Sequence, residues 1–249
     1  MPIKIKKHIP NTITSFNLLS GCISVVLAFE GYLTYAVYMI FLAAIFDFLD
    51  GMTARLLKAY SNVGKELDSL ADVVSFGVAP SVIMFHMMKV ALFKTVHILP
   101  LEHLSLVEVI FLIVPFFIAV LSGVRLAKFN VDERQTENFI GLAVPANALF
   151  FVSIYLVSIS DSHHIITNLL HNKMVLTPLI ILFSLLLVAE FPMFSFKFKN
   201  LGFKGNKIRY IFIVLSLILF ILLQTIAIPI IIVLYILLSA INNWIFNFE

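Results

Sequence analysis

The sequence predicts an all-α fold, a polytopic membrane helical bundle of about eight transmembrane helices. Two observations lead to this prediction. Of the 249 residues, 61% are hydrophobic and only 12% are charged, whereas soluble domains carry about 25% charged residues. The hydrophobic residues are also gathered in long runs that short polar segments separate. A water-soluble fold of this length could not bury so much apolar surface, so we expect lipid to surround much of the protein.

Eight runs are long and apolar enough to cross a membrane, since a spanning helix needs about 20 mostly apolar residues. The last two are separated only by a tight turn near Gln224 and Pro229, and Glu190 and Pro192 are expected to mark the end of the sixth. No repeat or long linker interrupts the series, so residues 1–249 are expected to form a single domain. The runs cover residues 11–29, 33–57, 68–90, 105–129, 142–159, 174–193, 209–226 and 229–246.

The distribution of basic residues predicts the orientation in the membrane. All but Lys89, Lys94 and Lys173 of the 17 Lys and Arg residues lie in the N-terminal tail or around the connections after the second, fourth and sixth runs. Cytoplasmic segments are enriched in Lys and Arg. We therefore expect these four segments and, for an even number of spans, both chain termini to be cytoplasmic, in a multi-pass protein of a cell (inner) membrane.

Other classes of protein are disfavoured by composition. The net charge of +3 is small, and the basic residues flank apolar runs instead of forming a continuous patch, so no nucleic acid is expected as a partner. The single cysteine, Cys22, excludes an intramolecular disulfide and any site built from several cysteines.

Four aspartates are concentrated around the connection between the second and third runs. Asp47 and Asp50 end one run, and Asp68 and Asp72 begin the next. Spacings of three and four residues place each pair on one face of its helix. Ionisable groups within spans are costly and usually face a polar cavity. We therefore expect the four carboxylates to converge on one site.

Four converging carboxylates favour a site for divalent cations, because they would otherwise repel one another. All-oxygen ligands suit Mg²⁺, Mn²⁺ or Ca²⁺, and two such ions could bridge a pyrophosphate and stabilise both oxygens of a displacement. In the alternative interpretation, the carboxylates cap helix ends or pair with Arg55, Lys58 and Lys65.

The acidic residues belong to a recognisable motif, Asp47-x2-Asp50-Gly51-x2-Ala54-Arg55-x8-Gly64-x3-Asp68-x3-Asp72. This motif resembles the signature of the CDP-alcohol phosphotransferases at all eight of its defining positions. The resemblance implies a six-helix catalytic core within the bundle. It also implies that the four aspartates hold two divalent metal ions, and that Asp72 is the catalytic base for the hydroxyl group of an alcohol that displaces CMP.

The resemblance further implies a site for the CDP group. Gly51, Ala54 and Gly64 would leave space for the cytidine, and Arg55 would contact a phosphate or brace the acidic cluster. Family comparison also suggests positions near the nucleotide for Asn11, Thr14 and Ser61.

Several stretches outside the motif resemble membrane-embedded phosphatidylserine synthases of bacteria and archaea. They are residues 9–14, 17–21, 71–80, 125–130 and 139–146. Lys128 stands where that group more often has arginine, which keeps the charge but not the bidentate geometry. The resemblance implies CDP-diacylglycerol as donor, with L-serine as acceptor and phosphatidylserine as product. Glycerol-3-phosphate, giving phosphatidylglycerophosphate, is the alternative acceptor, and an archaeal lipid substrate also remains open.

A serine acceptor requires a cation near the acidic site for its carboxylate. Arg125, Lys128 and Arg134 lie on the predicted cytoplasmic side, and a guanidinium such as that of Arg125 can hold a carboxylate through two hydrogen bonds. Alternatively, these residues only anchor the topology. Dianionic glycerol-3-phosphate would attract the same residues, so the positive charges do not distinguish the two acceptors.

A cation-coupled transporter is the competing class, with the aspartates as an ion site. Transporters of this kind often have inverted repeats and broken helices in both halves, whereas here the four aspartates occupy one short segment. The family resemblance favours the enzyme, and it also implies a homodimer among membrane lipids.

Overall fold

The computed structural model describes residues 3–95, 101–132, 139–160, 164–194, 202 and 206–246, and it confirms a polytopic helical bundle. The described residues contain one short antiparallel pairing, between β1 (Phe139–Ile140) and β2 (Pro192–Met193). The α-helices are α1 (Ile3–Phe29), α2 (Leu33–Leu57), α3 (Asn62–Asp72), α4 (Ala79–Phe93), α5 (Leu106–Ile113), α6 (Phe117–Val131), α7 (Val144–Ser158), α8 (His164–Leu170), α9 (Lys173–Val188), α10 (Lys207–Leu223) and α11 (Ala227–Phe246).

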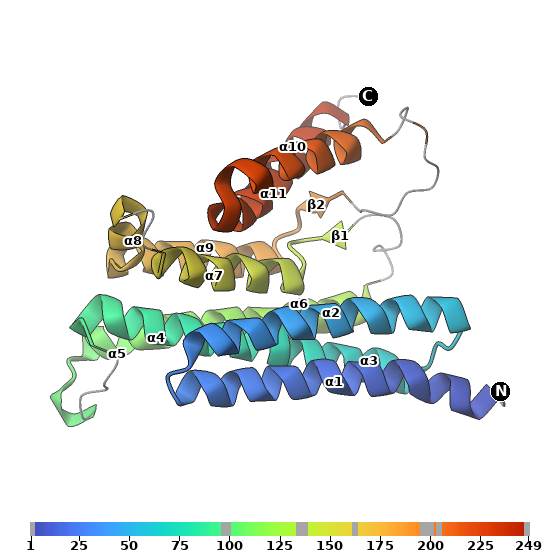
Figure 1. Ribbon diagram of the computed structural model, residues 1–249, viewed down its shortest axis with the longest axis horizontal. Coiled ribbons are helices and arrows are strands. Elements are labelled where there is room, and N and C mark those ends of the chain that lie inside the picture. Colours follow the sequence, from blue (N-terminus) through green and yellow to red (C-terminus); the bar gives the residue numbers. More distant parts are fainter. Residues whose placement is uncertain are drawn as a thin grey trace.

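The helices form a layered bundle, which Figure 1 shows with its long axis horizontal. Helices α1, α2, α4 and α6 run along this axis, α7 and α9 pack along them, and the hairpin of α10 and α11 covers α7 on the other side. The N-terminal end of α1, the connection between α2 and α3, and the C-terminal end of α6 lie at the same end of the bundle.

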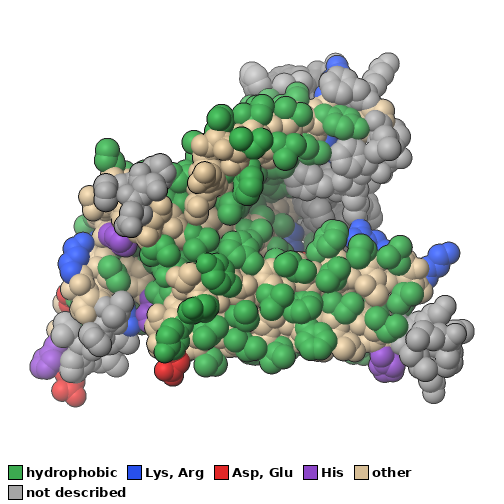
Figure 2. Space-filling model, viewed as in Figure 1, with side chains coloured by type: hydrophobic (Ala, Val, Ile, Leu, Met, Phe, Trp, Pro, Cys, Tyr) green, Lys and Arg blue, Asp and Glu red, His purple; other side chains and the backbone are tan. Residues whose placement is uncertain are grey.

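Five helical stretches of the described residues are long and apolar enough to cross a membrane: His8–Phe29, Leu33–Leu57, Asn62–Phe93, Leu106–Val131 and Lys207–Asn243. The last is not a single span, because the backbone breaks at Gln224 (φ 48°) and α11 folds back against α10. Together with the shorter apolar helices α7 and α9, they correspond to the eight predicted runs. Figure 2 shows hydrophobic side chains along the helices and charged side chains toward the two ends.

A π-helical turn interrupts the third long helix directly after Asp72. Residues Val73–Val78 form this turn between α3 and α4, and the backbone N–H of Ala79 donates to the carbonyl of Val74. Pro80 follows and has no N–H to donate within the helix. The wider turn accommodates this proline, and π turns inside α-helices often lie at functional sites.

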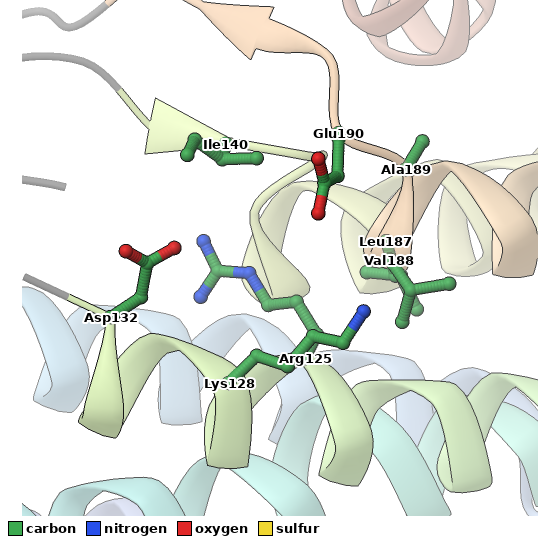
Figure 3. Close-up of a pocket in the computed structure, with 8 residues that line it drawn as sticks. All are labelled: Arg125, Lys128, Asp132, Ile140, Leu187, Val188, Ala189 and Glu190. Atoms are coloured by element: carbon green, nitrogen blue, oxygen red, sulfur yellow. The ribbon is translucent and has the colours of Figure 1, made fainter. Parts of the chain in front are cut away.

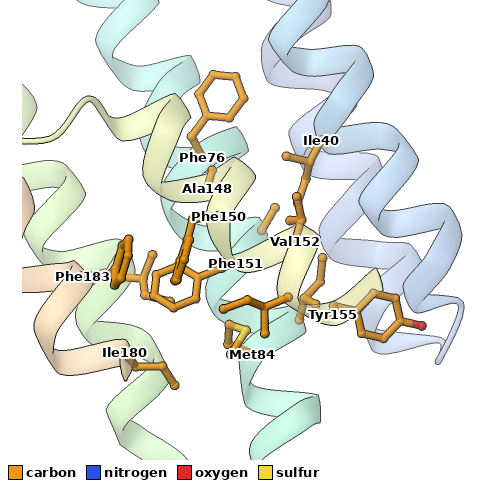
Figure 4. Packing of buried hydrophobic residues seen from close by; sticks show 14 of the residues in the cluster. Ile40, Phe76, Met84, Ala148, Phe150, Phe151, Val152, Tyr155, Ile180 and Phe183 are labelled. Carbon is orange, nitrogen blue, oxygen red and sulfur yellow. The ribbon is translucent and has the colours of Figure 1, made fainter. Parts of the chain in front are cut away.

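Helix α7 forms the centre of the hydrophobic core. The rings of Phe150 on α7 and Phe183 on α9 stack 3.5 Å apart, with Phe151 edge-on to both (Figure 4). At about 1.5 Å per residue, the 15 residues of α7 are shorter than the roughly 30 Å hydrocarbon layer. Irregular backbone at its end is tolerated at this depth because protein surrounds it.

The predicted sixth run, residues 174–193, extends too far at its C-terminal end. Helix α9 ends at Val188, as Glu190 and Pro192 indicated. The chain then turns to an extended path, in which Ile140 pairs with Pro192, and Gly141 donates its N–H to the carbonyl of Phe191 at 2.9 Å. A proline cannot continue a helix and favours an extended conformation for the residue before it.

Candidate active site

Helices α2 and α3 bring three of the four aspartates together. One carboxylate oxygen of each of Asp47, Asp50 and Asp68 lies within 4.8 Å of the others. The connection between the helices is short because Lys58 ends α2 in a left-handed conformation (φ 49°) and the Ser61 hydroxyl accepts the N–H of Gly64 at the start of α3. The chain therefore reverses direction between the two helices, both of which pack against α1, and the aspartates of α2 come close to Asp68 of α3.

The acidic cluster has the properties of a cation site. Within the described part of the chain, Asp50 Oδ2 and Asp68 Oδ1 are buried without a hydrogen-bond partner, which is costly for carboxylate oxygens. Two of the three basic residues that could have neutralised them, Arg55 and Lys65, make other hydrogen bonds. Arg55 Nε donates to the Gly51 carbonyl at 3.0 Å, and Lys65 Nζ donates to the Asn130 carbonyl at 2.9 Å. The donor set therefore fits a divalent cation bound by oxygen ligands.

Asp72 lies beside this cluster but is not one of the three converging carboxylates. It is 7% exposed, and its Oδ1 accepts a hydrogen bond from Asn17 Nδ2 at 3.3 Å. Asp72 is also close enough to Asp47 and Asp68 for like-charge repulsion. It is therefore a buried, oriented carboxylate one helical turn beyond Asp68.

Sequence analysis did not identify Asn17 as a site residue. Its carbonyl accepts the Ser75 hydroxyl at 3.0 Å, which fixes α1 against the π-helical turn. The signal was an amide among the polar residues of the first run, but its partner Asp72 is 55 residues away.

A cavity of about 520 Å³ opens beside the acidic cluster. Its volume is typical of sites for small molecules. Pro10, Ala59, Tyr60, Lys65 and Phe129 also line it, although they were not predicted. The seven residues expected to bind the CDP group all line this cavity, together with Asp50 and Asp68: Asn11, Thr14, Gly51, Ala54, Arg55, Ser61 and Gly64.

The two glycines of the motif differ in their surroundings. A Cβ atom added to Gly51 would have no described atom of another residue within 4 Å beyond its own helix, so it would project into open space. A Cβ atom added to Gly64 would lie 2.8 Å from Asn11 Oδ1 and 2.9 Å from Ser61 Oγ. A side chain at position 64 would clash with Asn11 and Ser61, so packing within the protein requires glycine there. Packing within the protein does not require glycine at position 51.

A second, smaller cavity of about 30 Å³ lies between the C-terminal part of α6, the segment at Ile140 and the end of α9 (Figure 3). Arg125 and Lys128 line it, as do Asp132, Ile140 and Glu190. Two of the three residues predicted to bind serine are thus brought together. The third, Arg134, lies outside the described residues.

Arg125 connects this cavity with the acidic site. Its guanidinium carbon lies 5.1 Å from the centre of the Phe129 ring, and Phe129 lines the larger cavity. Arg125 also interacts electrostatically with Asp72. The basic residue expected to hold an acceptor is therefore within electrostatic range of the carboxylate expected to activate it.

Known proteins are similar to this chain over more than half of its length. Residues 7–189 match the family model for CDP-alcohol phosphatidyltransferase. The chain is 34% identical over 157 residues to a CDP-diacylglycerol–serine O-phosphatidyltransferase of Bacillus subtilis, covering 63% of this chain and 77% of the relative. It is 28% identical over 199 residues to the Helicobacter pylori protein of that name, with coverage of 79% and 76%. An archaetidylserine synthase of Methanothermobacter thermautotrophicus is 34% identical over 151 residues, with coverage of 59% and 58%.

Proposed function

Because this integral membrane protein belongs to the CDP-alcohol phosphatidyltransferase family, we propose that it transfers the phosphatidyl group of CDP-diacylglycerol to the hydroxyl group of L-serine, giving phosphatidylserine and CMP. The main structural support is the 520 Å³ cavity, which the motif residues line beside the acidic cluster. The names of the Bacillus subtilis and Helicobacter pylori relatives support serine as the acceptor.

The donor would bind with its pyrophosphate near Asp50 and Asp68 and its cytidine over Gly51, Ala54 and Gly64. Arg55 lines the cavity and donates a hydrogen bond to the Gly51 carbonyl. Its guanidinium would contact a phosphate group. Asn11 and Thr14 would contact the nucleotide from α1, and Ser61 from the start of α3.

The four aspartates Asp47, Asp50, Asp68 and Asp72 would hold two divalent cations, Mg²⁺, Mn²⁺ or Ca²⁺. When bound, these ions would neutralise the pyrophosphate and stabilise charge on the entering and leaving oxygens. The unpartnered oxygens of Asp50 and Asp68 support this assignment.

Asp72 would act as the general base. Its carboxylate, oriented by Asn17, would take the proton of the serine hydroxyl while that oxygen forms a bond to the phosphorus of the phosphatidyl group. The bond between this phosphorus and the bridging oxygen would break, and CMP would leave with that oxygen. Positioning of the two reactants and proton transfer are the contributions of the chain itself.

The serine carboxylate would bind to Arg125, with Lys128 and Arg134 contributing positive charge. The burial of Arg125 and its electrostatic interaction with Asp72 support this role. The basic segments favour a cytoplasmic active site and cytoplasmic termini, and the family resemblance favours a homodimer.

The proposal is tested by measuring CMP release from purified protein with CDP-diacylglycerol and Mg²⁺ or Mn²⁺. We expect release that depends on L-serine, is lost with EDTA, and falls at least about 100-fold in Asp72→Asn, as expected for a general base. CMP release with glycerol-3-phosphate but not with serine would show that the acceptor is wrong and the proposed reaction type is right. A folded, cation-loaded sample that releases no CMP with any alcohol would refute the enzyme and favour the transporter.

A further inference from the structure

The smaller cavity carries charges of both signs. Arg125 and Lys128 project from α6 on one side, and Glu190 projects from the segment after α9 on the other (Figure 3). Asp132 adds a second carboxylate near the end of α6. The free volume of about 30 Å³ accommodates a water-sized group. A whole amino acid exceeds this volume, so its binding requires the side chains of Lys128 and Glu190, which are exposed at the rim, to change rotamer.

The positive side of the cavity contains a buried donor. Arg125 is 7% exposed, and its Nε has no hydrogen-bond partner among the described residues. A buried guanidinium N–H without an acceptor is costly. An anionic group in the cavity would satisfy this donor, and a carboxylate fits the planar guanidinium best.

The negative side of the cavity is the carboxyl end of α9. The last carbonyl groups of a helix have no partner inside it and carry partial negative charge. Here Leu185 accepts the N–H of Ala189, and Leu186 accepts that of Leu142. Leu187 and Val188 come next and line the cavity. Glu190 adds a full negative charge at the same place, so this side attracts a cation.

We propose that the cavity is a subsite for a zwitterion, in which Glu190 and the carboxyl end of α9 bind the ammonium group of the acceptor while Arg125 and Lys128 bind its carboxylate. This inference rests on the proposed function and adds a specificity-determining residue, Glu190, which lies just beyond the family match at residues 7–189. The same carboxylate and helix end would repel a phosphate dianion. The negative side therefore favours serine over glycerol-3-phosphate, which the basic residues alone could not do.

The test uses two acceptors that differ only in the ammonium group, L-serine and 3-hydroxypropionate, with CMP release as the readout. In Glu190→Gln, we expect the ratio of kcat/KM for serine to that for 3-hydroxypropionate to fall about 10- to 100-fold, the range for a hydrogen bond to a charged group. The change should appear mainly in the KM for serine, and Glu190→Asp should restore part of the ratio. The matched control is Glu30→Gln, which removes an exposed carboxylate in the turn between α1 and α2 and should keep the wild-type ratio.

A Glu190→Gln variant that loses activity with both acceptors equally would show a structural role for Glu190 and overturn the inference. An unchanged ratio in Glu190→Gln would overturn it as well, while serine-dependent release by the wild type would leave the proposed function standing. Wild-type protein that releases no CMP with serine would refute both. The KM for CDP-diacylglycerol, measured in each variant, reports on the integrity of the donor site.

Discussion

At the scale of single residues, Gly51 separates the needs of folding from those of ligand binding. It lies inside α2, where alanine is more favourable than glycine by about 0.5–1 kcal/mol, and the added Cβ would project into open space at the cavity. We therefore expect Gly51→Ala to raise the free energy of unfolding by about that amount. Because the methyl group occupies space for the donor, kcat/KM for CDP-diacylglycerol should fall about tenfold or more. Thermal unfolding in detergent and CMP release measure the two effects.

Gly123→Ala is the matched control for Gly51→Ala. Gly123 also lies inside a helix, α6, with no described atom of another residue within 4 Å of the added Cβ beyond its own helix, and it lines neither of the two cavities described above. It should gain stability without losing activity. Equal activity losses in both variants would contradict the assignment of the space at Gly51 to the donor.

Spacing along the chain indicated only site residues that lie close together in the sequence, whereas Asn11 and Thr14 were expected from the family resemblance. The spacing of Asp47, Asp50 and Asp68 predicted their convergence because a short connection joins the two helices that carry them. It could not predict the bond of Asn17 to Asp72 or the place of Phe129 in the cavity wall. These depend on packing between distant helices, and periodicity along the chain carries no signal for it.

At the scale of elements, Gly141 controls how closely residues 139–142 approach the end of α9. Its φ is +76°, and an added Cβ would lie 2.5 Å from the Leu187 carbonyl oxygen. We expect Gly141→Ala to lower the free energy of unfolding by about 2–4 kcal/mol, from backbone strain and a clash with fixed backbone. The KM for serine should also rise, because the segment carrying Glu190 must move. Denaturant unfolding and CMP release measure these effects.

Gly31→Ala separates the clash from the strain. Gly31 has a similar φ, +84°, but an added Cβ would meet no described atom within 4 Å. Gly31→Ala should lower the free energy of unfolding by only about 1 kcal/mol and leave the KM for serine unchanged. A Gly141→Ala variant no less stable than Gly31→Ala would show that the close approach to Leu187 is relieved easily.

The ends of the elements show what hydropathy can and cannot resolve. The predicted second run, 33–57, coincides with α2, because polar residues end it on both sides. The predicted sixth run continued five residues past Val188, since Phe191 and Met193 are as apolar as the helix before them. A hydropathy pattern does not distinguish helix from extended chain where protein buries both, and only Glu190 and Pro192 indicated the change.

At the scale of the whole molecule, cation binding should stabilise the fold, because three facing carboxylates destabilise it when no cation is bound. We expect Mg²⁺ or Mn²⁺ to raise the melting temperature of the detergent-solubilised protein and EDTA to reverse this. At 100 times the dissociation constant, the stabilisation is about 2.7 kcal/mol. Asp50→Asn should melt with little dependence on the cation.

The control for this measurement is Glu102→Gln, which changes an exposed carboxylate outside the acidic cluster and should keep the full cation-dependent shift. If Asp50→Asn also kept the cation-dependent shift in melting temperature, the cation would bind elsewhere and the acidic cluster would not be its site.

The separation of the two cavities also bears on how such enzymes diverge. Residues that line the larger cavity come mainly from α1, α2 and α3, whereas the smaller cavity is built from α6 and the segments at residues 140 and 187–190. Selection for a shared nucleotide can therefore preserve one set of helices while mutation reshapes the other. If the smaller cavity binds the acceptor as proposed, substitutions in α6 and after α9 can exchange one alcohol for another while the signature stays the same.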